Sequence, residues 1–125
     1  MMLMPLALLL AASQPITVEA PKSTSEIGYA PGALAYDALI SRDYRLAEQQ
    51  LLQTPKADRK DSAWLINYGK ALQHQGRVSE AEQAFREAAA LDDGELILAD
   101  GREVAARVAA ELALRQSRAM RQASR

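Results

Sequence analysis

The feature that most constrains this chain is an internal repeat with a period of about 34 residues. When the sequence is compared with itself at the offset 81 − 47 = 34, Ala47-Glu48-Gln49 aligns with Ala81-Glu82-Gln83. Further aligned positions match in size with two exceptions: Leu34 with Tyr68, Ala35 with Gly69, Ala38 with Leu72, Tyr44 with Val78 and Leu51 with Phe85. A repeat of this length predicts a stack of similar units, in which each unit buries its apolar face against its neighbours.

The second unit, residues 62–95, has the pattern of two antiparallel amphipathic helices. The first predicted helix carries its apolar residues at helical spacing and ends near Gly76: Trp64, Leu65, Tyr68, Gly69 and Leu72. The second opens with Ser79 three residues before Glu82, which is the pattern of a capping box, and continues through Ala81, Ala84, Phe85, Ala88 and Leu91. Gly69 and Ala81 lack bulk, so the two helices are expected to approach most closely there.

This second unit resembles a tetratricopeptide repeat, a helix-turn-helix unit of about 34 residues. The residues that match the family pattern are Leu65, Tyr68, Gly69, Leu72, Gly76, Ala81, Phe85, Ala88 and Leu91. The preceding unit, residues 28–61, keeps part of the pattern but has Arg42 in place of the turn glycine, and Pro55 shortens its second helix. The resemblance implies an all-α fold, a short α-solenoid of antiparallel helix pairs. The structural core it implies is Leu34, Tyr44, Ala47, Leu51, Leu65, Tyr68, Gly69, Leu72, Ala81, Phe85 and Ala88.

The segment after the second unit is expected to cover the open end of the stack. Val104, Val108 and Leu112 are spaced i, i+4, i+8, which predicts a capping helix from about Arg102 within a capping segment over 96–119. Asp100-Gly101 between apolar residues is instead a hairpin signal, so residues 95–99 are left open between helical and extended structure. The helical domain as a whole is predicted over 31–119.

The N-terminal residues 1–13 resemble a secretory signal peptide. The apolar run Met1–Ala12 is too short to span a bilayer, and small residues follow it. No Lys or Arg precedes Leu3, so the true start lying upstream and a buried N-terminal helix are the alternatives. Residues 14–30 are predicted to be a disordered lead-in. The chain is therefore expected to be periplasmic or secreted.

The composition removes most of the usual components of enzymes. The chain has no Cys and one His, which excludes disulfides, thiolate chemistry and a pair of His ligands. The acidic stretch around Asp92-Asp93-Gly94-Glu95 lacks the order of a calcium loop. Glu80, Glu82 and Glu87 are predicted to be solvated on the outer face of a helix. We therefore expect no catalytic residue, no metal site, no cofactor and no enzymatic activity.

The C-terminal end of the chain is basic, because four Arg and no acidic residue follow Leu112. Residues 120–125 are predicted to be a frayed, solvated tail, and contact with an anionic membrane surface is the alternative. Nucleic acid is not expected as a partner, because the net charge is −1 and the chain is predicted to be exported.

The resemblance also implies a partner-binding groove, lined by the first helix of each unit. Its predicted residues are Tyr36, Leu39, Ile40, Ile66, Asn67, Lys70, Gln73 and His74, with Tyr29 and Ala63 as further candidates. Those of the second unit lie opposite Leu65 and Leu72 on the helix, and the polar residues among them have no expected role in the core. The expected function is an exported, non-enzymatic adaptor that binds a protein or peptide segment. The alternative is a structural or self-associating subunit of a cell-envelope complex, which would form homo-oligomers.

Overall fold

The computed structural model describes residues 34–55, 59, 61–91, 94–97 and 101–123. Its helices are α2 (Tyr36–Ile40), α3 (Tyr44–Leu52), α4 (Ser62–Gln73), α5 (Val78–Leu91) and α6 (Ala106–Ala123), and its strands are β1 (Glu95–Ile97) and β2 (Glu103–Ala105). The prediction of an all-α fold that ends in a C-terminal helix is confirmed. The predicted signal segment 1–13 and the lead-in 14–30 lie outside the described residues. Within the described residues, no helix is both long and apolar enough to cross a membrane.

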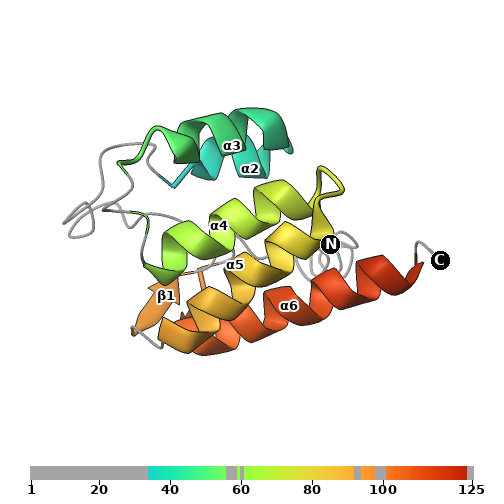
Figure 1. Ribbon diagram of the computed structural model, residues 1–125. Coiled ribbons are helices and arrows are strands. Elements are labelled where there is room, and N and C mark those ends of the chain that lie inside the picture. The colour runs from blue at the N-terminus through green and yellow to red at the C-terminus, as the bar shows by residue number, and fades with distance from the viewer. Residues whose placement is uncertain (1–33, 56–58, 60, 92–93, 98–100, 124–125) are drawn as a thin grey trace, which may run out of the picture.

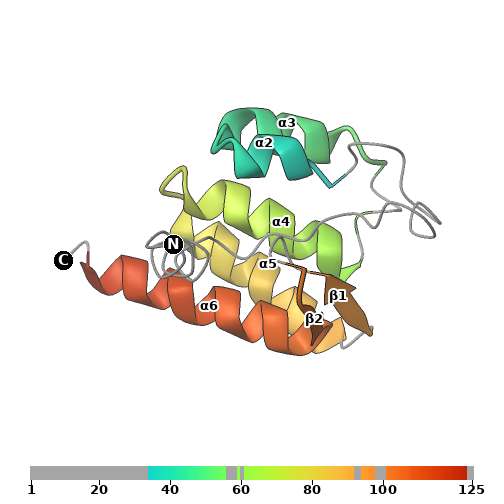
Figure 2. The same ribbon diagram turned by 180° about the vertical axis from the view of Figure 1, so that it is seen from behind.

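The helices form a row in which α4 has a central place. The α2–α3 pair lies on one side of α4, and α5 and α6 follow on the other side (Figures 1 and 2). Aspartates begin two of the helices: the Asp43 carboxylate accepts a hydrogen bond from Leu46 N, and the Asp61 carboxylate accepts one from Trp64 N. These caps fix where α3 and α4 start.

The repeat in the sequence is also a repeat in conformation. Helix α3 begins at Tyr44 and α5 at Val78, and 78 − 44 = 34. The turn before each helix contains a residue with positive φ, Arg42 at 62° and Gly76 at 84°, and these differ by the same offset, 76 − 42 = 34. The aligned Ala47 and Ala81 are both fully buried. The α2–α3 and α4–α5 turns therefore share a left-handed residue at the same position, although only the second turn has glycine there.

Replacing Arg42 by Gly is expected to raise the free energy of unfolding by about 1 kcal/mol, because glycine adopts a positive φ without the steric cost that a Cβ brings. Urea denaturation followed by Trp64 fluorescence measures the change. The reverse substitution at the aligned position, Gly76→Ala, is the matched control and should lower the free energy of unfolding by a similar amount. A destabilised Arg42→Gly variant would contradict the assigned turn geometry.

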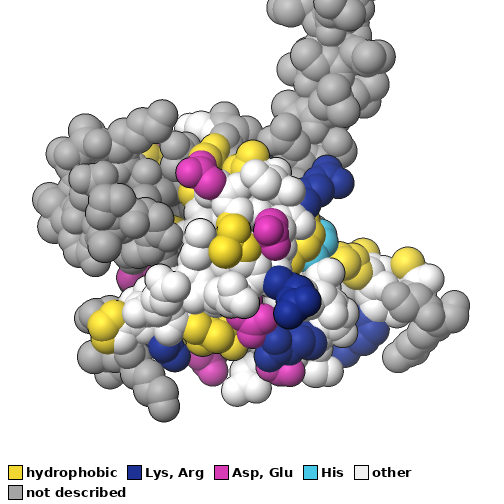
Figure 3. Space-filling view, turned by 90° about the horizontal axis from the view of Figure 1, so that it is seen from above, with side chains coloured by type: hydrophobic (Ala, Val, Ile, Leu, Met, Phe, Trp, Pro, Cys, Tyr) yellow, Lys and Arg dark blue, Asp and Glu magenta, His cyan; other side chains and the backbone are white. Residues whose placement is uncertain are grey.

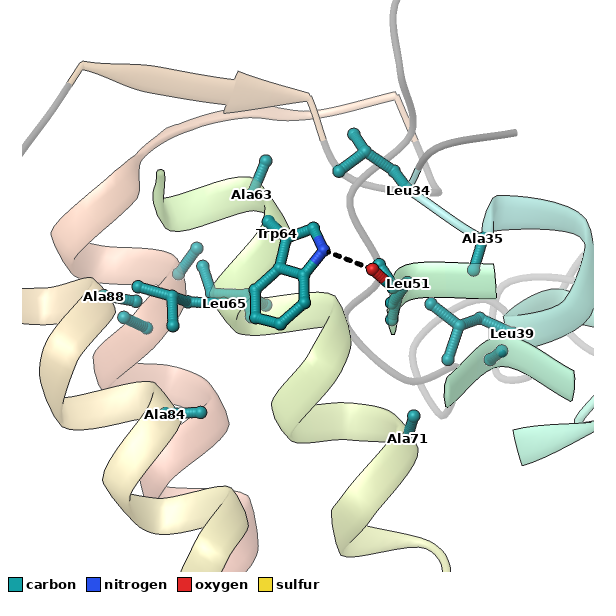
Figure 4. Close-up of a cluster of buried hydrophobic side chains, with 14 of the residues drawn as sticks. Leu34, Ala35, Leu39, Leu51, Ala63, Trp64, Leu65, Ala71, Ala84 and Ala88 are labelled. Atoms are coloured by element: carbon teal, nitrogen blue, oxygen red, sulfur yellow. Dashed lines mark hydrogen bonds between the residues drawn. The ribbon is translucent and has the colours of Figure 1, made fainter. Parts of the chain in front are cut away.

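The core surrounds α4 on its two packed sides. All predicted core residues are buried except Tyr44 and Tyr68, which are half-buried. Trp64 packs between α4 and α3, and its indole Nε1 donates a hydrogen bond of 3.0 Å to the Leu51 carbonyl (Figure 4). On the α5 side, Gly69 faces the Phe85 ring so closely that a Cβ at Gly69 would lie 2.4 Å from Phe85 Cε1. The large Phe85 ring on α5 therefore requires a residue without a side chain at position 69 of α4.

The segment between α5 and α6 is a β-hairpin. Strands β1 and β2 pair antiparallel, with Glu95 opposite Ala105, and Gly101 between them has a φ of 87°. The hairpin ends where Ala106 N donates to the Gly94 carbonyl. The predicted helix start at Arg102 is therefore wrong by four residues, because α6 begins at Ala106. Of residues 95–99, for which the sequence allows helical or extended structure, Glu95–Ile97 are extended. Residues 98 and 99 lie outside the described part.

Two further predictions about charged and polar groups are wrong. Ser79 lies inside the first turn of α5, which begins one residue earlier at Val78, so it does not cap that helix. Glu82 is buried rather than solvated, and its carboxylate forms ion pairs of 3.2 Å with Arg86 and with Arg121. Residues 120–123 are accordingly helical and held to α5, not frayed. Small residues make this close approach of α6 possible, since its buried face consists of Ala106, Ala109, Ala110, Ala113 and Ser117.

Candidate functional site

Helix α4 presents three faces with different surroundings. Leu65, Gly69 and Leu72 face the apolar residues of α5. Trp64 and Asn67 face the α2–α3 side, where their side chains donate to backbone carbonyls. A third face carries Ile66, Lys70 and Gln73, spaced i, i+4 and i+7. We refer to these three residues as the Lys70 face.

Lys70 is a buried cation whose partner is neutral. The residue is 2% exposed, and its Nζ donates a hydrogen bond of 3.0 Å to Gln116 Oε1 on α6. Among the described residues no carboxylate lies within ion-pair distance of it. Burial lowers the pKa of the Lys70 ammonium to about 8, so the side chain is still mostly charged at neutral pH. The charge is thus desolvated without a compensating anion in this part of the chain.

Two more polar side chains of this region lack partners. Gln73 is 1% exposed, and neither its amide nitrogen nor its amide oxygen has a hydrogen-bond partner among the described residues. The buried hydroxyl of Ser117, next to Gln116 on α6, also has no hydrogen-bond partner among the described residues. Buried polar groups are normally satisfied, so a site at which several are not is a candidate for binding.

His74 ends α4 and stacks on Tyr44 of α3, with ring centroids 4.4 Å apart. Partial burial, and then the positive charges of Lys70 and Arg42, lower the pKa of the imidazole to about 4. The sequence predicts a solvated His at a helix end, where the helix dipole favours the cation. The structure shows an exposed residue whose ring is nevertheless held neutral by its surroundings.

Acidification is expected to destabilise the fold through His74. Its pKa in the folded state lies below the unfolded value of 6.5, so the unfolded chain binds the proton first. The contribution of this group to stability is therefore fully present above pH 6.5 and is lost as the pH falls toward 4. Urea denaturation across this range should show a steeper loss for the wild type than for His74→Phe, which keeps the stacking but cannot be protonated. Parallel losses in the two proteins would show that His74 is not responsible.

A pair of acid–arginine contacts joins successive units, and sequence reasoning missed both. Glu48 of α3 pairs with Arg77 at 2.8 Å, just beyond α4. The aligned Glu82 of α5 pairs with Arg121 in the last turn of α6. Arg77 directly precedes α5, whereas Arg121 lies in the last turn of α6, so the two acids are aligned in the repeat but their arginine partners are not. The recurrence of Ala-Glu-Gln one repeat later marks the two acids as equivalent, but it does not identify the arginines that they contact.

The predicted groove residues do not form an exposed line. Leu39, Ile66, Asn67, Lys70 and Gln73 are buried, Tyr36 is half-buried, and Ile40 and His74 are exposed. Leu39 belongs to the apolar core. The expectation that the polar residues have no role in the core is wrong for Asn67, whose Nδ2 donates a hydrogen bond of 2.9 Å to the Leu34 carbonyl. Ala63 is buried too, and Tyr29 lies outside the described residues.

Neither a metal site among the described residues nor a similar known protein indicates a function for this chain. Within the described ranges, no three Asp, Glu or His side chains come together in a group that could hold a metal ion. The chain matches no protein-family model, no curated protein and no solved structure. The function therefore has to be inferred from the geometry of α4 and its neighbours.

Proposed function

We propose that the protein is a non-enzymatic interaction module that binds a carboxylate-bearing segment of a partner protein at the Lys70 face. The observation that carries the proposal is the buried Lys70 ammonium, whose partner in the described structure is the neutral amide of Gln116. A desolvated charge without a counter-ion costs stability, and an apolar residue in its place would avoid that cost. A partner carboxylate would supply the missing counter-ion. Because Ile66, Lys70 and Gln73 are at most 2% exposed, the proposal requires that this face opens when the partner binds.

The neighbouring polar groups fit a peptide as the ligand. The Gln73 amide offers two donor hydrogens and one acceptor oxygen, and neither atom is used within the described chain. A main-chain peptide group needs one donor and one acceptor in return. Gln73 lies three residues after Lys70 on the same face, so one extended segment reaches both.

The arrangement of the two helix pairs also supports a role in binding other proteins. The two helix pairs follow one repeat and resemble tetratricopeptide units, whose characterised members bind segments of other proteins. Export is part of the proposal and depends on the apolar run Met1–Ala12. The proposed protein is thus an exported adaptor.

Replacing Lys70 by Met is expected to stabilise the fold and to weaken partner binding. The free energy of unfolding should rise by about 1 to 2 kcal/mol, because a desolvated charge is replaced by an apolar side chain of similar length. Binding should fall at the same time. The measurement is selection of a random peptide library on immobilised protein, in which wild-type protein enriches peptides rich in Asp, Glu or a free C-terminus.

The matched control is Arg118→Met, which removes an exposed cation from α6 and should retain the enriched peptides. The proposal fails if Lys70→Met retains the same peptides as the wild type, or if the wild type enriches none. A Lys70→Met protein that is less stable than the wild type would instead show that Lys70 is a structural residue.

Self-association is the second candidate function. Three large apolar side chains of the α2–α3 pair are well exposed, Ile40 at 45% and Leu46 and Leu52 at 40% each. Figure 3 views the molecule from the side of this pair and shows apolar side chains, in yellow, on its surface among charged ones. Such residues on one helix pair favour contact with a second copy.

Size-exclusion chromatography with light scattering decides between the two functions. An oligomer that persists on dilution and dissociates when Leu46 is replaced by Lys favours a structural subunit. A monomer favours the adaptor.

A further inference from the structure

The α2–α3 pair is attached to the fold through α4. Its substantial contacts with other described helices are all with α4, whereas α4, α5 and α6 each pack against the two others. Figures 1 and 2 show the pair at the edge of the row, beside α4 and apart from α6. Loss of this one interface would free the pair and leave the three-helix remainder in contact.

The interface between the pair and α4 combines an apolar cluster, which includes Leu39, Leu51 and Trp64, with a few single polar contacts, and it is smaller than the α4–α5 interface. Trp64 Nε1 donates to the Leu51 carbonyl at 3.0 Å, and Asn67 Nδ2 donates to the Leu34 carbonyl at 2.9 Å. Beyond the other end of α4, Gln75 Nε2 donates to Glu48 Oε1 at 2.9 Å. Because water can replace either partner when the pair opens, each such contact contributes only a little to holding the pair in place.

Backbone strain is concentrated in the same pair. Ala35 and Arg42 have φ values of 55° and 62°, and they are the non-glycine residues with positive φ in the described chain. They lie close before and after α2, which has five residues and no side-chain cap at its start. Non-glycine residues in this conformation are strained, so the backbone of the pair is less stable than that of the α4–α5 turn, which has Gly76 at the equivalent position.

The acid–arginine contact of this junction is the more solvated of the two. The two arginines are similarly exposed, Arg77 at 40% and Arg121 at 47%, but the acidic side chain is 17% exposed at Glu48 and only 2% at Glu82. A solvated ion pair is weaker and is screened by salt. The α3–α4 junction is therefore held less firmly than the α5–α6 junction.

We propose that the α2–α3 pair is a lid that lifts off α4 as one unit, at a lower free energy than global unfolding, and uncovers the α4 face carrying Trp64 and Ala71. This opening is a property of the fold and is independent of binding at the Lys70 face. The rest of the structure stays closed, because α5 and α6 continue to bury the other side of α4.

The indole N–H of Trp64 tests the proposal directly by hydrogen exchange in the full chain. This N–H belongs to α4 but donates to Leu51 near the C-terminal end of α3, so its exchange alone would not distinguish separation of the helices from fraying of that end. The Ala47 amide near the start of α3 makes the distinction, because fraying of the C-terminal end would leave it protected, whereas a lifted short helix is only marginally stable in water. Nuclear magnetic resonance should show the indole N–H exchanging together with the Ala47 amide of α3 and about tenfold or more faster than the amides of α5. Exchange of the indole N–H at the rate of the α5 amides would overturn the proposal.

A matched pair of variants identifies the contact that holds the lid. Glu48→Gln removes the charge that binds Arg77 from the α3 side, and Glu80→Gln removes the carboxylate that binds the same arginine from within α5. Glu48→Gln should accelerate indole exchange about twofold to fivefold with the α5 amides unchanged, and Glu80→Gln should leave it unchanged. Equal acceleration of all amides by Glu48→Gln, or equal effects of the two variants on the indole, would contradict a separate lid.

Discussion

Replacing Phe85 by Ala is expected to lower the free energy of unfolding by about 3 to 5 kcal/mol, the range for a fully buried phenylalanine. Phe85 is 0% exposed and packs with Leu72, Ala81 and Ala113, so one ring connects α4, α5 and α6. Small domains are stable by only about 5 to 15 kcal/mol, so this loss removes between about a fifth and all of the stability of the fold. Circular dichroism during urea denaturation measures the loss.

The control for Phe85→Ala is Leu91→Ala on the same helix. Leu91 is 43% exposed, so its truncation should change the free energy of unfolding by less than about 1 kcal/mol. Similar denaturation curves for the two variants would show that the register of α5 is incorrect.

Replacing Gly69 by Ala is the second large effect, and it should lower the free energy of unfolding by about 3 kcal/mol, toward the upper end of the usual cost of overpacking. The new Cβ would lie 2.4 Å from Phe85 Cε1 and 2.8 Å and 2.9 Å from two other ring atoms. The ring is fully buried and cannot move aside, so α4 and α5 must separate. The same denaturation measurement applies.

A double-mutant cycle shows whether the clash with Phe85 is the cause. The clash is with ring atoms of Phe85, and the smaller leucine side chain at position 85 would leave room for a Cβ at position 69. Gly69→Ala combined with Phe85→Leu should be less destabilised than the sum of the single variants by at least about 1 kcal/mol. Strict additivity would mean that Gly69 is required for a reason other than the ring.

The repeat made much of the fold predictable. Ala81 and Phe85 align with Ala47 and Leu51, which lie one repeat earlier and are also apolar. Stacked repeats bury equivalent positions, and all four residues are buried. The hairpin signal at Asp100-Gly101 was also informative, because glycine tolerates the positive φ that the turn requires. The helix start was misplaced because Val104 fits the spacing of a helix and of a strand equally well.

The contacts between units were not predictable from the pattern. Helical periodicity places Glu82 on a polar face, and only the position of α6 shows that Arg121 reaches it and that the carboxylate is shielded. Lys70 was treated as an exposed groove residue for the same reason, although Gln116, far along the chain, covers it. Arg42 illustrates a different limit, because the sequence shows the loss of a turn glycine but not that the turn keeps its geometry without one.

Site-specific photo-crosslinking in the cells that express the protein tests the interaction module most directly. A photoreactive amino acid is placed at His74, beside the Lys70 face, and in a separate protein at Gln83, which is exposed on α5. We expect irradiation to attach one protein species at position 74 and not at position 83, and Lys70→Met to abolish the adduct. Equal labelling at the two positions, or an adduct at position 74 that persists in Lys70→Met, would contradict binding at the Lys70 face.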